Sequence, residues 1–176
     1  MRNIATTRIL HAPESTGALG SHRPWIWPLP RLDGAAPRIV GPVDRSVHDG
    51  VDLGYPDCGS SPGVVPVLAA RDGVITYAGI TKDGPTVCID HAGGWSTQYA
   101  NLDHVLAMPT DRFRRRRKTR VRTGDVLGHA RRFPLRVRFG LARLGDSGWS
   151  VVDPTELMHA WAVLPWRTEP AVDQAA

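Results

Sequence analysis

Between residues 64 and 142, short apolar runs alternate with turn residues. The runs are rich in Val, Ile, Thr and Tyr, which favour strands, and they cover residues 64–70, 74–80, 86–91, 95–100, 126–129 and 135–142. Turn pairs stand between them, at Asp72-Gly73, Asp83-Gly84, Gly93-Gly94, Gly124-Asp125 and Gly145-Asp146. The first three pairs recur every 10 or 11 residues, which indicates antiparallel hairpins. The pattern predicts an all-β domain with one short helix over residues 154–159, where Asp153 is the N-cap and Pro154 the first helical residue.

The run 135–142 has two different faces. Leu135, Val137, Phe139 and Leu141 alternate with Arg136, Arg138, Gly140 and Ala142. Because side chains alternate across a strand, the apolar set must face the core. Arg136 and Arg138 therefore project together from the opposite face, which must be wet or lined with acidic side chains.

Composition supports one folded domain with extensions. The chain has 176 residues, of which 41% are hydrophobic, and 18 Gly and 15 Pro fit a turn-rich fold. Residues 1–37 are predicted to be an N-terminal extension that ends in a Trp/Pro-rich arm, whose tryptophans anchor it on the domain surface. Residues 38–166 form the domain, and residues 167–176 are a disordered tail. Cys58 and Cys88 are too few for a disulfide framework, although a single bridge between them stays open.

The termini and apolar runs say little about location. No signal peptide is visible at the N-terminus, and no stretch approaches the about 18 apolar residues that a membrane helix needs. The sequence therefore predicts a soluble protein and leaves its localisation unknown.

The formal net charge of +5 comes from one region. Residues 112–143 hold 13 of the 22 Lys and Arg residues and a single acid, Asp125. A basic insertion loop is predicted over about residues 109–122. Its Arg114, Arg115, Arg116, Arg117 and Lys118 form a candidate anion-binding site, and a solvated loop without a specific role is the equal alternative. No specific nucleic-acid motif accompanies the loop.

The candidate chemistry begins with His48 and Asp52. They are four positions apart, and Gly50 and Gly54 argue against a helix, so both side chains share a face of a strand. A His and a carboxylate on one face are typical zinc ligands. Taken alone, the signal is weak, because a His and an Asp at this spacing more often form a surface hydrogen-bonded pair.

The surrounding motifs change that interpretation. His48-Asp49-Gly50-Val51-Asp52 is followed by further motifs in a fixed order: Ala70-Arg71-Asp72-Gly73-Val74, Val87-Cys88-Ile89-Asp90-His91, Tyr99-Ala100-Asn101-Leu102, Thr123-Gly124-Asp125-Val126 and Val152-Asp153-Pro154. Over residues 38–158 this series resembles the lysostaphin-type (LytM-type) zinc endopeptidases, which cut peptide cross-links in bacterial peptidoglycan. The resemblance implies a duplicated hybrid motif with a long groove across a β-sheet. It also implies a zinc ion held by two histidines and an aspartate, and a site of action at the cell wall.

Only two of the family's five functional positions match. The resemblance makes His48 and Asp52 remnant zinc ligands and places Arg138 where the third ligand belongs. It places Arg136 and Asn101 where the two catalytic histidines belong. Because a guanidinium offers no lone pair and neither Arg136 nor Asn101 serves as a general base, we expect a degenerate member without zinc and without catalysis.

Two hypotheses concern the vacated metal site. The guanidinium of Arg138 is expected to occupy it and to pair with Asp52, which would otherwise be a carboxylate without a partner. Alternatively, His104 or His129 supplies a displaced third ligand, although each is better interpreted as a surface or structural histidine. His91 is interpreted as structural, with hydrogen bonds near the sheet.

Three functions follow from these expectations. The first is a non-catalytic domain that binds peptidoglycan or a cell-wall-associated protein through the former active-site groove. The second is an active zinc endopeptidase with an unusual site. The third is a polyanion-binding protein that uses its arginine-rich loop.

Overall fold

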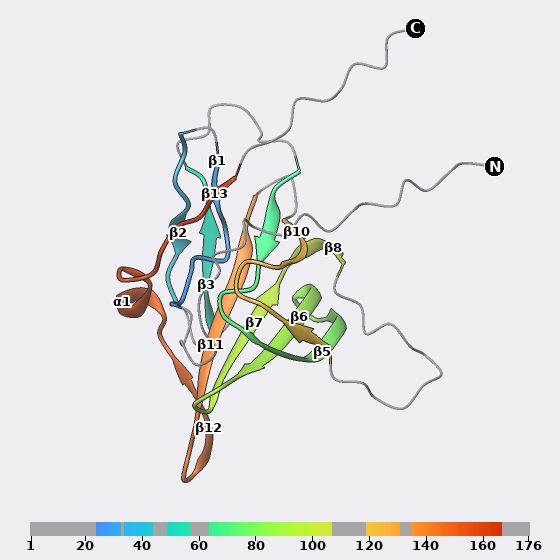
Figure 1. Ribbon diagram of the computed structural model, residues 1–176, viewed down its shortest axis with the longest axis vertical. Helices are drawn as coiled ribbons and strands as arrows, with labels where there is room; N and C mark the ends of the chain where they lie inside the picture. The colour runs from blue at the N-terminus through green and yellow to red at the C-terminus, as the bar shows by residue number, and fades with distance from the viewer. Residues whose placement is uncertain are drawn as a thin grey trace, which may run out of the picture.

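The computed structural model describes residues 24–32, 34–43, 49–56, 64–106, 119–130 and 135–166. Figure 1 shows strands packed in layers with one short helix, as the alternating pattern predicts. The elements are β1 (Arg31–Leu32), β2 (Arg38–Gly41), β3 (Gly50–Gly54), β4 (Pro66–Leu68), β5 (Gly73–Thr81), β6 (Gly84–His91), β7 (Trp95–Ala100), β8 (Leu102–Val105), β9 (Arg120–Val121), β10 (Val126–Ala130), β11 (Val137–Gly145), β12 (Gly148–Val152), α1 (Thr155–Met158) and β13 (Pro165–Trp166). The all-β prediction is confirmed.

The described strands form one large sheet and two small ones. The large sheet is eight-stranded, with the order β2-β3-β11-β7-β6-β5-β9 and with β12 paired to β11. Strands β4, β10 and β8 form a second sheet, and β1 pairs with β13 in parallel. Strand β11 is central, because residues 137–140 pair with β3 on one side and residues 138–143 pair with β7 on the other. The predicted hairpins at Asp83-Gly84 and Gly93-Gly94 join β5, β6 and β7.

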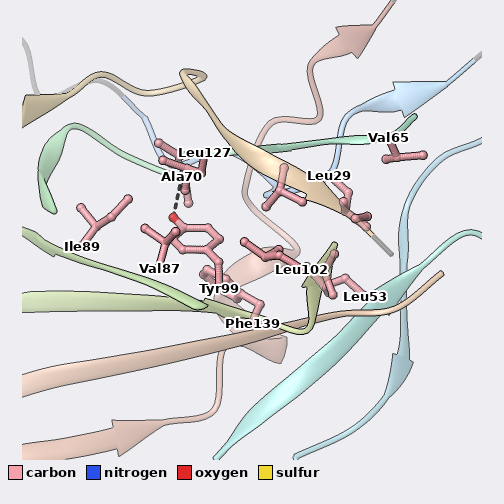
Figure 2. Close-up of a cluster of buried hydrophobic side chains, with 14 of the residues drawn as sticks. Leu29, Leu53, Val65, Ala70, Val87, Ile89, Tyr99, Leu102, Leu127 and Phe139 are labelled. Carbon is pink, nitrogen blue, oxygen red and sulfur yellow. Dashed lines mark hydrogen bonds between the residues drawn. The ribbon is translucent and has the colours of Figure 1, made fainter. Parts of the chain in front are cut away.

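The predicted apolar face of residues 135–142 lies in the core. Val137, Phe139 and Leu141 are buried, and Leu135 packs against the same cluster. Phe139 meets Tyr99 of β7 with ring centroids 5.4 Å apart, among buried side chains from several strands (Figure 2). The opposite face of β11, which carries Arg138, therefore points away from this core cluster.

The Trp/Pro-rich arm is part of the core rather than a surface extension. Ile26 and Leu29 are buried, and the Ile26 backbone N–H donates to the Ala70 carbonyl at 3.0 Å. Trp25 stacks on Trp161 with ring centroids 4.9 Å apart. The arm therefore packs against the sheets through the apolar residues between its prolines, and the domain boundary at residue 38 stays a prediction.

Two further predictions need correction. Within the predicted basic loop, Arg120 and Val121 form β9 and pair with β5, because Val121 supplies an apolar side chain that becomes buried. Helix α1 starts at Thr155 with Pro154 as its N-cap. The carboxylate of Asp153 still accepts the Thr155 backbone N–H at 2.9 Å, so it satisfies a donor of the first turn from one residue earlier.

Other predictions lie outside the described residues. These are the first part of the extension, the tail over residues 167–176, Cys58, and the basic side chains Arg114, Arg115, Arg116, Arg117 and Lys118. Cys88 is a half-buried free thiol. Among the described residues, no helix has the length and apolar character that crossing a membrane would require.

Candidate functional site

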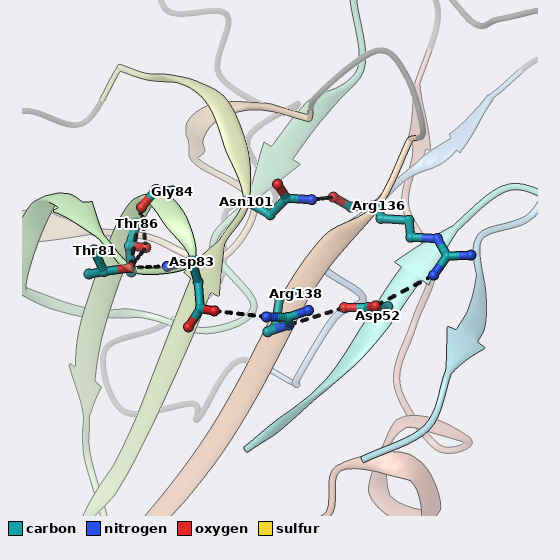
Figure 3. Close-up of polar contacts among 8 residues, drawn as sticks. All are labelled: Asp52, Thr81, Asp83, Gly84, Thr86, Asn101, Arg136 and Arg138. Carbon is teal, nitrogen blue, oxygen red and sulfur yellow. Dashed lines mark hydrogen bonds and ion pairs between the residues drawn. The ribbon is translucent and has the colours of Figure 1, made fainter. Parts of the chain in front are cut away.

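Strands β3 and β11 place Asp52 directly opposite Arg138. The two residues are cross-strand partners, and Ala100 of β7 flanks Arg138 on its other side. The guanidinium Nε of Arg138 donates to Asp52 Oδ1 at 3.2 Å (Figure 3). The predicted ion pair between these residues is therefore present. His48 lies outside the described residues.

A second carboxylate reaches Arg138 from the turn between β5 and β6. Arg138 Nη1 donates to Asp83 Oδ1 at 2.9 Å. The turn is fixed locally, because the Asp83 backbone N–H donates to Thr81 Oγ1 at 3.1 Å and the Thr86 hydroxyl donates to the Gly84 carbonyl at 2.9 Å. Arg138 thus links β3, β11 and the β5–β6 turn, and its side chain is 23% exposed against 11% for Asp52 and 18% for Asp83.

Arg136 holds the other oxygen of Asp52 more loosely. Its Nη1 lies 3.8 Å from Asp52 Oδ2, and its side chain is 50% exposed. Arg138 of β11 and Arg136, which directly precedes the strand, therefore project from the same wet face, as the alternation predicts. Two guanidinium groups and the carboxylates of Asp52 and Asp83 balance one another in formal charge.

Asn101 joins β7 to β8 in a backbone conformation that few residues adopt. Its φ is 60°, a left-handed value that Asn tolerates better than most residues with a Cβ. Its side-chain Nδ2 donates to the Arg136 carbonyl at 2.8 Å, and its backbone N–H donates to the Asp83 carbonyl at 2.9 Å. Asn101 therefore connects Arg136, at the start of β11, to the β5–β6 turn through two hydrogen bonds.

A polar pocket opens beside this network. Its volume is about 580 Å³, and the residues that line it are Lys82, Asp83, Gly84, Pro85, Asn101, Leu102, Asp103 and Arg138. The lining offers cations, carboxylates and an amide together. The site therefore suits a polar ligand that carries donors and acceptors of both signs.

Sequence reasoning missed Asp83 as a site residue. It was assigned only to a turn, because Asp-Gly is a common hairpin pair. One signal could have pointed to Asp83. The face that carries Arg136 and Arg138 is expected to be lined with acidic side chains, and Asp52 alone can pair closely with only one of the two arginines.

His104 and His129 belong to a different sheet from Asp52. They are cross-strand partners on β8 and β10 in the three-stranded sheet, whereas Asp52 belongs to the large sheet. The described residues include no group of three or more His, Cys, Asp or Glu side chains that could hold a metal ion.

His91 is structural, as predicted. It is buried, Nδ1–H donates to the Asp72 carbonyl at 2.9 Å, and Nε2 lies 2.7 Å from the Thr97 hydroxyl. The Thr97 and Tyr99 hydroxyls lie 3.1 Å apart, and the Ala70 N–H donates to the Tyr99 oxygen at 2.8 Å. Burial raises the pKa of Tyr99 to about 12, so this phenol keeps its proton. His91, Thr97 and Tyr99 therefore form a buried chain of hydrogen bonds in which every side chain has a partner.

Burial of His91 makes the fold sensitive to acid. Burial is the largest cause that lowers the pKa of His91, and the nearby Arg71 charge lowers it further. In the unfolded chain the His91 side chain has a pKa of about 6.5. Above that pH the side chain is neutral in both states, and the fold has its full stability. As the pH falls below that value, the unfolded chain binds a proton more readily than the folded one, and the free energy of unfolding decreases. We expect the free energy of unfolding to fall more between pH 7.5 and pH 5.5 in the wild type than in His91→Gln, as measured by urea denaturation. Equal falls would contradict this role of His91.

Comparison with known proteins identifies the class. The family model of peptidase family M23 matches residues 46–133, half of the chain, and the chain belongs to this family. The resemblance to lysostaphin-type endopeptidases is thereby confirmed. A comparison with curated proteins finds no match.

Solved structures of the same class share the fold. One is a protein from Ruminococcus gnavus assigned as the glycyl-glycine endopeptidase LytM, with 20% identity and a TM-score of 0.60 over 82% of this chain. This chain spans 64% of that protein's length. Another is Csd3 of Helicobacter pylori, with 18% identity and a TM-score of 0.50 over 74% of this chain and 33% of Csd3. At these identities the likeness concerns the fold.

Proposed function

We propose that this M23 domain is a non-catalytic module that binds peptidoglycan through the polar pocket beside Arg138. The observation that carries the proposal is the Arg138 guanidinium bonded to Asp52. In the family to which the chain belongs, Asp52 corresponds to a zinc ligand. In this chain the same carboxylate already holds a fixed cation.

The side chains around Asp52 do not fit a catalytic zinc ion. Such an ion needs about three protein ligands and one open position. Both oxygens of Asp52 face guanidinium groups, at 3.2 Å for Arg138 and 3.8 Å for Arg136. A guanidinium has no lone pair to donate, and its positive charge would repel the ion. We therefore derive no hydrolytic step through a metal.

A general base is also missing at the family's catalytic positions. The guanidinium of Arg136 has no basic lone pair that could accept a proton. The Asn101 amide has no basic nitrogen and already donates to the Arg136 carbonyl. Neither residue at these two positions can therefore transfer a proton in hydrolysis, and the Asn101 amide instead holds the Arg136 backbone.

The pocket lining supports a peptide ligand of mixed charge. Lys82 can pair with a carboxylate of a peptide, Asp103 can accept from an amine or amide, and Leu102 adds an apolar wall. Membership of a peptidoglycan-cleaving family directs the proposal to wall peptides. Binding through the arginine-rich loop to a polyanion stays a prediction, because Arg114–Lys118 lie outside the described residues.

The direct experiment is co-sedimentation with insoluble peptidoglycan, together with an assay for released peptides. The wild type should sediment with peptidoglycan and release no peptide. Lys82→Glu, which reverses a charge on the pocket lining, should weaken binding by about tenfold. Arg120→Glu is the matched control, because Arg120 is an exposed cation on β9 outside the pocket lining, and it should bind like the wild type. Absence of binding, equal effects of the two variants, or peptide release would overturn the proposal.

A further inference from the structure

A pair of histidines outside the family's metal site has the arrangement of a metal chelate. His104 on β8 and His129 on β10 are directly opposed across antiparallel strands, with ring centroids 6.4 Å apart and ring planes at 60°. Directly opposed residues project their side chains from the same side of a sheet. Both imidazoles therefore lie over the same face of the three-stranded sheet.

We propose that His104 and His129 bind one divalent transition-metal ion between their rings. An imidazole nitrogen binds zinc at about 2.0–2.1 Å, which places the ion about 3.2 Å from the ring centroid. Two rings on one ion therefore have centroids at most about 6.4 Å apart, and closer when the two bonds are bent. The observed separation equals that upper limit. Because the His104 side chain is 69% exposed, its ring can rotate toward His129 without displacing core side chains.

Asp103 prepares His104 for this role. Its Oδ2 lies 3.0 Å from His104 Nδ1, so Nδ1–H donates to the carboxylate and the lone pair of Nε2 is left for a metal. A carboxylate behind a ligating histidine fixes the ring and makes it more basic. Burial, with a smaller effect of His104, lowers the pKa of His129.

The chemistry of the site selects the class of ion. Two imidazole nitrogens with water in the other positions suit Cu²⁺, Ni²⁺ and Zn²⁺ rather than Mg²⁺ or Ca²⁺. Asp103 also lines the polar pocket, so an ion held by His104 would lie near the pocket rim. This inference does not depend on the proposed function, because the two histidines lie in a different sheet from Asp52.

The test is calorimetric titration of the 176-residue chain with Ni²⁺ and, separately, with Zn²⁺. We expect one site per chain in the wild type, lost in the double variant H104A/H129A. Asp103→Asn should weaken binding about tenfold, as removal of a carboxylate partner of a ligating histidine does. His159→Ala, which removes another exposed histidine, should leave the affinity unchanged.

Asp52→Asn separates this site from the family's metal site and should also leave the affinity unchanged. Circular dichroism of each variant checks that the fold is retained. The Cu²⁺ complex should show two nitrogen ligands by electron paramagnetic resonance in the wild type. Equal binding by H104A/H129A, or loss of binding in Asp52→Asn, would overturn the proposal.

Discussion

Arg138→Met is expected to lower the free energy of unfolding by about 3 kcal/mol, because it removes the cation that bonds two largely buried carboxylates and leaves only the more distant Arg136 beside one of them, Asp52. Asp52 and Asp83 have side chains only 11% and 18% exposed, and both bond to Arg138. Methionine fills a similar volume, so the lost charge rather than a cavity dominates the effect. Urea denaturation at neutral pH measures the change.

A variant that also removes the two carboxylate charges isolates the electrostatic origin of that loss. The triple variant R138M/D52N/D83N should recover most of the stability, because it removes the like charges that Arg138→Met leaves together. Arg143→Met is the matched control on the same strand. Arg143 lies over the Trp95 ring at 5.1 Å from its centroid, an exposed contact worth about 0.5–1 kcal/mol. Equal losses in Arg138→Met and Arg143→Met would show that Arg138 does not hold the two carboxylates.

Gly50→Ala is expected to destabilise the protein by about 3 kcal/mol, because two backbones approach too closely there for a side chain. A Cβ at Gly50 would lie 2.6 Å from the Phe139 carbonyl oxygen and 2.9 Å from its carbon. Relief requires β3 to move away from β11, which also separates Asp52 from Arg138. Urea denaturation measures the loss.

Gly145→Ala provides the matched control for Gly50→Ala. Gly145 ends β11, and a Cβ there would meet its nearest atom, the Gly148 carbonyl oxygen, at 4.0 Å. Its substitution should change the free energy of unfolding by about 0.5 kcal/mol or less. If Gly50→Ala changed the free energy of unfolding by as little as Gly145→Ala, β3 would accommodate a Cβ at residue 50 without destabilising the sheet.

The sequence was sufficient for the strands with strong alternation. Residues 95–100 form β7 as predicted, and the two faces of residues 135–142 have the predicted environments, because period-two alternation directly reports which side of a strand is buried. Short strands such as β8 and β13 were missed. They are set by pairing with distant segments and not by a local pattern.

The site could be predicted only in part, because some of its contacts also depend on segments that are distant in the sequence. Arg138 and Asp52 could be paired from the motif order, since the family's metal ligands must converge in space. Asp83 could not, because its approach to Arg138 depends on how far the β5–β6 turn reaches over β11. The packing of Leu29 into the core was equally invisible, since proline-bounded residues carry no periodicity.

Zinc content measured by equilibrium dialysis tests the central claim, that Arg138 replaces the metal at Asp52. The measurement compares H104A/H129A with the same protein carrying Asp52→Asn, so that any zinc on the histidine pair is removed from both. We predict that the two proteins bind the same amount of zinc and that neither releases peptides from peptidoglycan. One zinc ion per chain that is lost on Asp52→Asn, accompanied by cross-link cleavage, would contradict the account.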